Sequence, residues 1–225
     1  MKWTREFRKA VTFSYDDGNR QDIRLLEMLN TYGLKCTFNL NSGLNGNEIW
    51  KYKGVDVQRL NLEQCAELYK GHEIAVHGSC HLNPTELSPE ELSQELAGNK
   101  AELTRIFGVE PVGMAYAYGC YNNAVINQAK EIRLKYGRTT EPSHSFDIQR
   151  DLMRFRPTCH HDDAMLFELA EKFLSLNPKK PQIFYVWGHS YEPDGNQNWD
   201  RLERLFEMLA GKNEIFYGTN AEILL

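Results

Sequence analysis

The sequence contains no long apolar run and no excess of basic residues. A transmembrane helix needs about 20 consecutive, mostly apolar residues, and no stretch of that kind occurs. The formal net charge is −5, with acidic and basic residues interspersed, so no extended basic face is expected for nucleic acid or anionic lipid. We therefore expect a small-molecule or oligosaccharide substrate, and neither a nucleic-acid partner nor a membrane partner.

Cysteine is scarce, and no C-x-x-C pair occurs. The five cysteines are odd in number and widely spaced, a pattern typical of reduced thiols rather than of a disulfide framework. Residues 1–9 carry positive charge, but no apolar core follows them, so this segment does not resemble a secretory signal. If the N-terminus is the native one, these absences predict a cytoplasmic protein.

Low-complexity segments, Pro/Gly/Ser-rich linkers and internal repeats are also missing. The chain has 225 residues, of which 41% are hydrophobic, enough to bury a full core. Strand-like and helix-like patterns alternate from end to end, which predicts one α/β domain over residues 1–225 with a largely parallel sheet. About seven or eight strand-helix units result, enough for a barrel or an open wound sheet.

The expected elements follow from hydrophobic periodicity and from caps. Ser88, followed by Pro89 and Glu91, predicts a helix that begins with a capping box. Residues 42–53 are rich in Gly and Asn, and are interpreted as a long loop. Strands are expected at residues 11–15, 35–41, 73–77, 112–117, 134–139, 152–158, 182–187 and 215–217. Further helices are expected at residues 25–32, 61–70, 123–133, 164–174 and 199–209.

Polar residues stand where several of these strands end. Asp16 and Asp17 follow the first strand, and two adjacent carboxylates repel each other unless a cation, a proton or an opposite charge lies nearby. An ordinary N-cap and turn is the alternative. Because the carboxyl ends of parallel strands converge in α/β barrels, we expect these residues to meet at one face. The other strand ends carry His77, Tyr118 with Gly119, and His189.

The segment HGSCH spaces His77 and His81 four residues apart. On a helical turn this spacing places both imidazoles on one side, where they could bind one metal ion. Two partly exposed histidines in a loop are the alternative. With one carboxylate added, such a set leaves coordination positions open, which favours a catalytic metal over a structural one.

Four motifs in order, TFSYDDG, HGSCH, AYAYG and VWGH, resemble those of the polysaccharide deacetylase family, the chitooligosaccharide deacetylase homology domain. The resemblance spans residues 11–189. It implies a distorted (β/α) barrel of about seven strand-helix units. It also implies a metal-dependent hydrolase that deacetylates an N-acetylated sugar or oligosaccharide.

The resemblance assigns roles to the first two motifs. Asp16 corresponds to the catalytic base, and Asp17 to a metal ligand that binds together with His77 and His81. The expected cofactor is one divalent ion. Zinc is the first choice for two histidines and one carboxylate, with cobalt, manganese, iron or nickel as alternatives.

The resemblance also assigns roles to the last two motifs. Tyr118, before Gly119, corresponds to the residue whose backbone N–H binds the oxyanion. His189 corresponds to the general acid, and Trp187 lines the pocket for the acetyl methyl group. These roles are chemically coherent, because activated water, a base and an acid suffice without a covalent nucleophile.

Two departures from the family pattern concern the base and the histidine loop. The arginine that usually tethers the base is replaced by Ala115, so Asp16 lacks that partner unless Arg138, Arg154 or Arg156 reaches it. Gly78 stands where the family usually has Ser or Thr, which removes a hydroxyl that helps to fix the loop.

The fourth family motif, an Asp-Trp pair that orients the general acid, has no clear match. Asp147 and Asp151 lie in the right region, but no tryptophan follows either residue. Four interpretations of the nearby His160 and His161 stay open. They belong to a loop that binds substrate, support the site residues from behind, form a second metal site, or lie in a solvated turn.

Two further functions stay open at this point. Relatives with the same barrel hydrolyse other amides or cyclic imides, and the retained ligands do not separate these from sugar substrates. A non-catalytic carbohydrate-binding domain is the third possibility, because of Ala115 and the missing fourth motif. The sequence leaves the substrate, the native metal and the oligomeric state undetermined.

Overall fold

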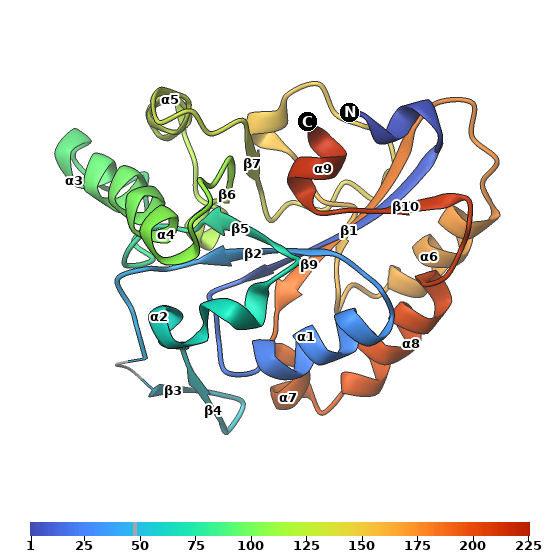
Figure 1. Cartoon of the computed structure of the whole chain (residues 1–225), viewed down its shortest axis with the longest axis horizontal. Helices are drawn as coiled ribbons and strands as arrows, with labels where there is room; N and C mark the ends of the chain where they lie inside the picture. Colours follow the sequence, from blue (N-terminus) through green and yellow to red (C-terminus); the bar gives the residue numbers. More distant parts are fainter. Residues whose placement is uncertain (47–48) are drawn as a thin grey trace.

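The fold is built on a curled sheet, seen in a computed structural model that describes residues 1–46 and 49–225 (Figure 1). The strand order is β7-β6-β5-β2-β1-β9-β8, with β10 paired to β1, and all these pairs are parallel. The strands are β1 (Lys9–Asp16), β2 (Cys36–Leu40), β5 (Glu73–Val76), β6 (Gly113–Ala115), β7 (Tyr136–Arg138), β8 (Cys159–His160), β9 (Gln182–His189) and β10 (Ile215–Tyr217).

The sheet closes at a seam between β7 and β9. Phe155 forms an isolated bridge with Arg138 of β7, and its N–H donates to the Gly137 carbonyl at 2.9 Å. Three residues later the Thr158 N–H donates to the Tyr185 carbonyl of β9 at 2.8 Å. The expected distorted (β/α) barrel of about seven units is therefore confirmed, and β7 is brought round to face β1.

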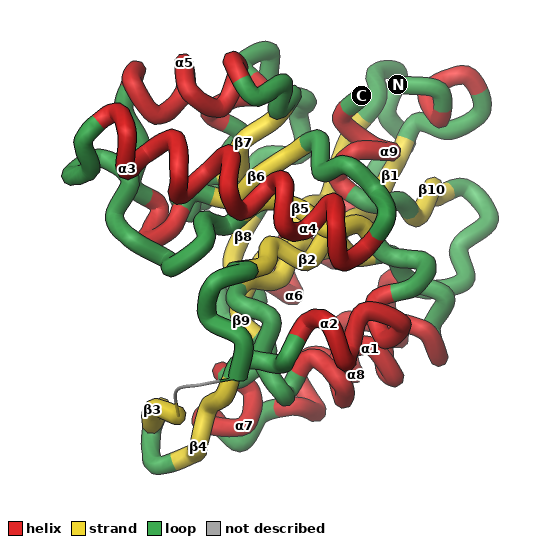
Figure 2. Tube along the Cα trace, turned by 60° about the vertical axis from the view of Figure 1, so that its left-hand side comes forward, coloured by secondary structure: helices red, strands yellow, loops and turns green. Residues whose placement is uncertain are grey.

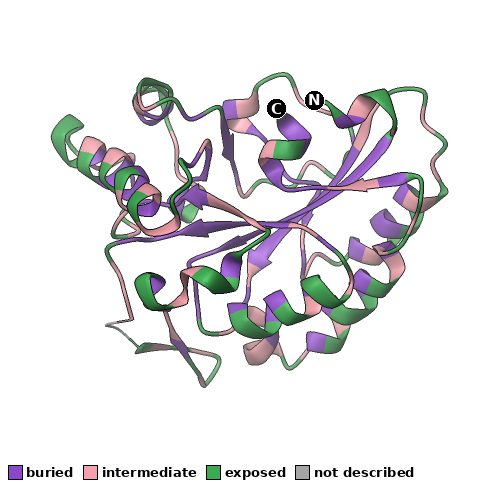
Figure 3. Ribbon diagram, viewed as in Figure 1, coloured by how far each residue is buried: buried purple, intermediate pink, exposed green. Residues whose placement is uncertain are grey.

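The helices form an outer layer on this sheet, while the strands β1, β2 and β9 are almost entirely buried (Figure 3). Phe13 of β1 packs edge-on against Phe206 of the helix Trp199–Leu209, with ring centroids 5.0 Å apart. No helix in the described part of the chain combines the length and the apolar character needed to cross a membrane. The helices are α1 (Asp22–Thr31), α2 (Leu62–Cys65), α3 (Pro89–Ser93), α4 (Asn99–Phe107), α5 (Asn123–Glu131), α6 (Leu166–Ser175), α7 (Glu192–Asn196), α8 (Trp199–Leu209) and α9 (Asn220–Leu224).

The helix that begins at Ser88 is interrupted. Its capping box is present, because the Ser88 side chain accepts from the Glu91 N–H and the Glu91 side chain accepts from the Ser88 N–H. A π-helical turn over Gln94–Gly98 then separates α3 from α4. Such turns insert one residue into the helical repeat and change which side chains face the sheet.

Residues 49–52 were expected in a loop, and this prediction was wrong. They form β3 (Ile49–Tyr52), which pairs antiparallel with β4 (Val55–Gln58) in a hairpin that projects from the body beside α7 (Figure 2). Lys53 and Gly54 both have positive φ, +48° and +86°, as a two-residue hairpin turn requires. Residues 47–48 of the expected loop lie outside the described residues.

The strand expected over residues 152–158 was also wrong. Leu152–Arg154 is a 3-10 turn, because Asp151 caps it by accepting from the Met153 N–H at 3.1 Å. Pro157 has no N–H to donate to a strand ladder. The strand at this edge begins two residues later, with Cys159 in β8.

Candidate active site

The carboxyl ends of β1, β5, β7 and β9 bring the polar residues together. Asp16, the last residue of β1, is in register with His189, the last residue of β9, and with Asn39 of β2. His77 follows β5 directly, and Arg138 ends β7. The expectation that these strand ends would converge at one face is met, as parallel strands of a barrel require.

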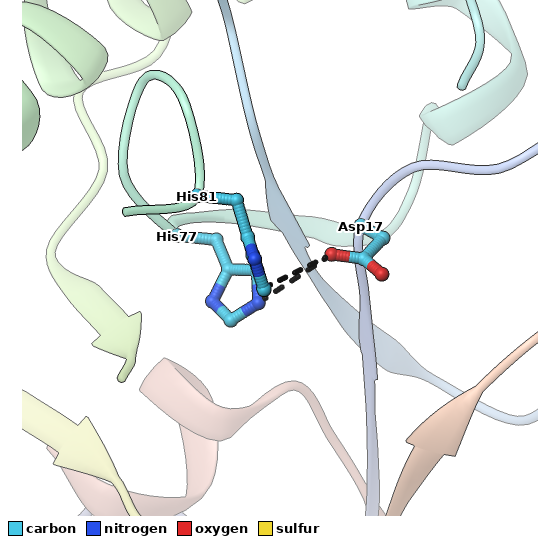
Figure 4. A group of neighbouring side chains, drawn as sticks. All are labelled: Asp17, His77 and His81. Carbon is cyan, nitrogen blue, oxygen red and sulfur yellow. Dashed lines mark ion pairs between the residues drawn. The ribbon is translucent and has the colours of Figure 1, made fainter. Parts of the chain in front are cut away.

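Asp17, His77 and His81 form a group suited to a metal ion (Figure 4). Asp17 Oδ1 lies 3.7 Å from His77 Nε2 and 3.5 Å from His81 Nε2. The carbonyl of Ala115 accepts from His77 Nδ1 at 2.9 Å, which leaves Nε2 unprotonated in the neutral ring. Among the described residues this buried Nε2 has no hydrogen-bond partner. The donor set therefore fits a divalent cation.

The two histidines are not on a helical turn, contrary to expectation. The segment after β5 is a loop in which Gly78 has φ +83° and His81 has φ +54°. This backbone brings the two imidazole rings to a centroid distance of 4.8 Å. Burial, together with His77, lowers the pKa of His81 to about 4. A neutral imidazole is the form that binds metal.

Asp17 has a neighbour that sequence reasoning missed. Arg59, just after β4, lies 3.2 Å from Asp17 Oδ1, and its guanidinium stacks 4.8 Å from the Trp50 ring. Burial works to raise the pKa of Asp17, but His189, His77, His81 and Arg59 hold it below its ordinary value. Asp17 itself has φ +81°, so its backbone is in the left-handed region directly after β1.

Asp16 is buried and fully partnered. Burial works to raise its pKa, yet Arg138, His77 and His189 hold the pKa below its ordinary value. Arg138 reaches Asp16 Oδ2 from across the barrel, and Asn39 Nδ2 donates to Oδ1 at 2.8 Å. The other two candidates for this contact pair elsewhere: Arg154 contacts Asp151 and Arg156 contacts Glu141.

His189 lies between Asp16 and a carboxylate that sequence reasoning missed. Its Nε2 is 4.0 Å from Asp16 Oδ2, and its Nδ1 is 3.3 Å from Glu192 Oε2. Its backbone N–H donates to the same Glu192 oxygen at 2.8 Å. Burial works to lower the pKa of His189, but Glu192, Asp17 and Asp16 raise it to about 9. The H-x-x-E spacing is the one sequence signal for this pair.

His160 and His161 also face Glu192. Each Nε2 lies 3.1 Å from Glu192 Oε2. His161 is 1% exposed, and its Nδ1 is 3.0 Å from the Tyr15 hydroxyl, so the solvated turn is wrong for this segment. His160 Nδ1 accepts from the Asp162 N–H at 3.1 Å, which places the proton of a neutral ring on Nε2. His160, His161 and Glu192 thus form a second group of potential metal ligands, so the interpretation as a second metal site stays open.

Tyr118 lies beside His81, and Trp187 lies beside His189. Tyr118 is 66% exposed, and its ring lies 4.5 Å from that of His81. The turn that carries Tyr118 depends on Gly119, where φ is +70° and a Cβ would come within 2.2 Å of Thr140 Oγ1. Trp187 is 9% exposed, and the Arg138 guanidinium lies 4.4 Å from its ring.

Comparison with known proteins supports the resemblance. The family model for polysaccharide deacetylase matches residues 5–137. The chain is 28% identical over 138 residues to YxkH of Bacillus subtilis (strain 168), whose name assigns it to the polysaccharide deacetylases. The match covers 60% of this chain and 46% of YxkH, so the chain spans about half the length of that relative.

Solved structures share the fold at low sequence identity. A family 4 carbohydrate esterase from Streptomyces lividans, in complex with acetate, is 16% identical with a TM-score of 0.62, over 94% of this chain and 93% of its own. An acetyl xylan esterase from Clostridium thermocellum, in complex with a cobalt ion, is 14% identical with a TM-score of 0.61, over 95% and 89%. With the curled barrel and the matched family model, these findings show that the chain belongs to the polysaccharide deacetylase family.

Proposed function

We propose that this protein is a metal-dependent hydrolase that removes the acetyl group from an N-acetylated sugar or oligosaccharide. One observation carries the proposal: Asp17, His77 and His81 converge, while Asp16 stands beside them with its own partners. The two adjacent carboxylates thus have different surroundings, one suited to a cation and one to a proton. A single catalytic domain and a cytoplasmic location stay predictions.

Asp17, His77 and His81 would hold one divalent ion. When bound, the ion supplies Lewis acidity that polarises the amide carbonyl and makes a water molecule more acidic. Two nitrogens and one oxygen favour zinc, with cobalt, manganese, iron or nickel as alternatives. The cobalt ion of the Clostridium thermocellum esterase supports an ion of this class.

Asp16 would take the proton of the attacking water. Its pKa is held low by Arg138, so the carboxylate is ionised and free to accept a proton at neutral pH. Arg138 and Asn39 occupy both of its oxygens, which fixes the orientation of the carboxylate. The buried Arg138 would therefore tether Asp16, a role for which the family usually has an arginine at the position of Ala115.

His189 would donate a proton to the departing amine. With a pKa of about 9, the ring is protonated at neutral pH, and Nε2 is the nitrogen on the Asp16 side. Glu192 contacts the opposite nitrogen, Nδ1, and thereby orients the ring and stabilises its charge. Glu192 supplies what the absent Asp-Trp motif would supply.

Tyr118 would contribute at the oxyanion and at the substrate ring. Its backbone N–H is the proposed oxyanion donor, which costs no reorganisation because the turn is preformed. Its exposed ring beside His81 offers an apolar face of the kind that packs against sugars. Trp187, in the wall near His189, would contact the acetyl methyl group.

Two other functions remain as alternatives. Hydrolysis of a non-sugar amide or cyclic imide would use the same residues at the centre of the site, with substrate contacts at its edge that suit a different molecule. A non-catalytic role is known for a protein of similar fold. BA3943 of Bacillus anthracis, 15% identical with a TM-score of 0.60, is described as a CE4 family pseudoenzyme. Arg138 and Glu192 weaken that alternative, since each contacts the residue whose usual partner is missing.

The test combines metal content with acetate release. Protein purified without chelator is expected to hold about one divalent ion per chain and to release acetate from N-acetylated chitooligosaccharides. Turnover of a cyclic imide without acetate release would favour the second function. If the protein binds no ion, even when zinc or cobalt is added, both proposed hydrolase functions are contradicted.

A further inference from the structure

Glu95 is a buried carboxylate that the proposed reaction does not use. It lies in the π-helical turn between α3 and α4 and is 5% exposed. No ion pair of Glu95 occurs within residues 1–46 and 49–225. Burying a carboxylate without a cation is costly unless several hydrogen bonds offset the lost hydration.

Among the described residues, the side-chain hydrogen bonds of Glu95 all go to the loop that carries His81. Oε1 accepts from the Leu82 N–H at 3.1 Å and from the Cys80 N–H at 3.0 Å, and Oε2 lies 3.1 Å from the same Cys80 nitrogen. Its backbone carbonyl accepts from the Ser79 N–H at 3.0 Å. The carboxylate therefore binds the residues on both sides of His81.

Gly78 makes room for this contact. Its φ is +83°, and a Cβ at this position would come within 2.5 Å of Glu95 Oε1. The family usually has a hydroxyl side chain at the position of Gly78. In this chain the Glu95 carboxylate occupies the space that such a side chain would need. Asn99, four residues further along, accepts from the His77 N–H at 3.1 Å. The helix thus holds both metal-binding histidines through Glu95 and Asn99.

His81 needs such support, because its backbone is in the left-handed region with φ +54°. A non-glycine residue there costs roughly 1 to 3 kcal/mol unless its surroundings hold it in place. We infer that Glu95 is the positioning residue that fixes His81 for metal binding, in place of the hydroxyl absent at position 78. This inference rests on the proposed function, because it assumes a metal ion at Asp17, His77 and His81.

The test is metal affinity measured by competition with a chromophoric chelator, with zinc as the probe. Glu95→Ala is expected to weaken zinc binding about 10- to 100-fold, the usual effect of losing a group that orients a ligand. Glu95→Gln keeps an acceptor oxygen but loses the charge, so a smaller loss is expected. Glu90→Ala, an exposed glutamate of α3, is the matched control and should bind zinc like the wild type.

A double-mutant cycle separates positioning from general destabilisation. If Glu95 acts through His81, adding Glu95→Ala to His81→Ala should weaken zinc binding by less than twofold further. Circular dichroism and thermal unfolding with chelator present report whether each variant folds. Should Glu95→Ala fail to fold, the same cycle with Glu95→Gln decides the question.

The outcomes distinguish this inference from the proposed function. Zinc affinity within twofold of wild type in folded Glu95→Ala, or an equal loss with and without His81, would overturn the role of Glu95 and leave the hydrolase proposal standing. A wild-type chain that binds no zinc, cobalt or manganese would instead remove the proposed metal site itself, and with it the basis of this inference.

Discussion

Two histidines at the rim of one barrel have opposite electrostatic surroundings. His81 is half-buried beside His77, so its pKa falls to about 4. His189 is also half-buried, but the Glu192 carboxylate lies 3.3 Å from its Nδ1 and its pKa rises to about 9. One ring is therefore neutral at pH 7 and the other is charged. Pairs of groups whose surroundings separate their pKa values mark the different roles of a catalytic site.

The largest expected effect is on the neutral side of this comparison. His77→Ala removes one of the three proposed ligands, so protein purified without added metal is expected to lose the ion and acetate release to fall by at least about a thousandfold. Elemental analysis and an acetate assay measure both. His144→Ala, an exposed histidine paired with Asp163, is the control and should keep the ion. Retention of the ion by His77→Ala would show that the ligands are different ones.

Asp16→Asn tests the residue that lies between the two histidines. It removes the proposed base but none of the three metal ligands, so acetate release should fall by about 10² to 10⁴. Metal content should stay unchanged, since Asp17, His77 and His81 are all retained. Acetate release near the wild-type rate would eliminate Asp16 as the base.

Arg138→Met tests the charge balance around the base. It leaves Asp16 buried without its cation, which is expected to lower the free energy of unfolding by about 3 to 5 kcal/mol. Denaturant unfolding measures the change. Arg154→Met is the matched control, because its ion pair with Asp151 is exposed and screened by solvent, so a much smaller loss is expected. Equal losses in the two variants would mean that the buried ion pair has no special weight.

Glu192→Gln should remove the electrostatic difference between the histidines. If protonated His189 is required, wild-type kcat/KM falls as the pH rises through about 9. In the variant this alkaline limb should move toward the ordinary histidine value of about 6.5. The stability that protonated His189 contributes is likewise complete below about pH 6.5 and lost as the pH rises through 9. An alkaline limb that does not move would contradict the pairing.

The convergence of Asp17, His77 and His81 could be predicted because these residues stand at the ends of clear strands. Asp17 and the HGSCH segment each follow a strand whose apolar pattern is clear, and strand ends of a parallel sheet meet. The loop geometry was not predictable, because positive φ at His81 depends on contacts with Glu95, far along the chain.

The acid side was less predictable because its contacts depend on how the sheet curls. Nothing in the sequence distinguishes Arg138 from Arg154 or Arg156 as the partner of Asp16. Arg138 faces Asp16 because the sheet curls at the seam through Phe155. Glu192 begins a helix of five residues, too short for a periodic signal. The hairpin of β3 and β4 was missed because Gly and Asn nearby obscured its alternation.

We expect the barrel to open first at the seam through Phe155. The pairing of β1 with β9 extends over eight residues, from Lys9 to Asp16, whereas β7 meets Phe155 through one bridge. Backbone pairs with few neighbours open most often in native proteins. We expect the amide hydrogens of residues 137–139 and 155 to exchange with solvent before those of β1. Each such opening would separate the β7 end from Asp16, so local opening at this joint would limit how long the proposed base keeps the orientation that Arg138 gives it.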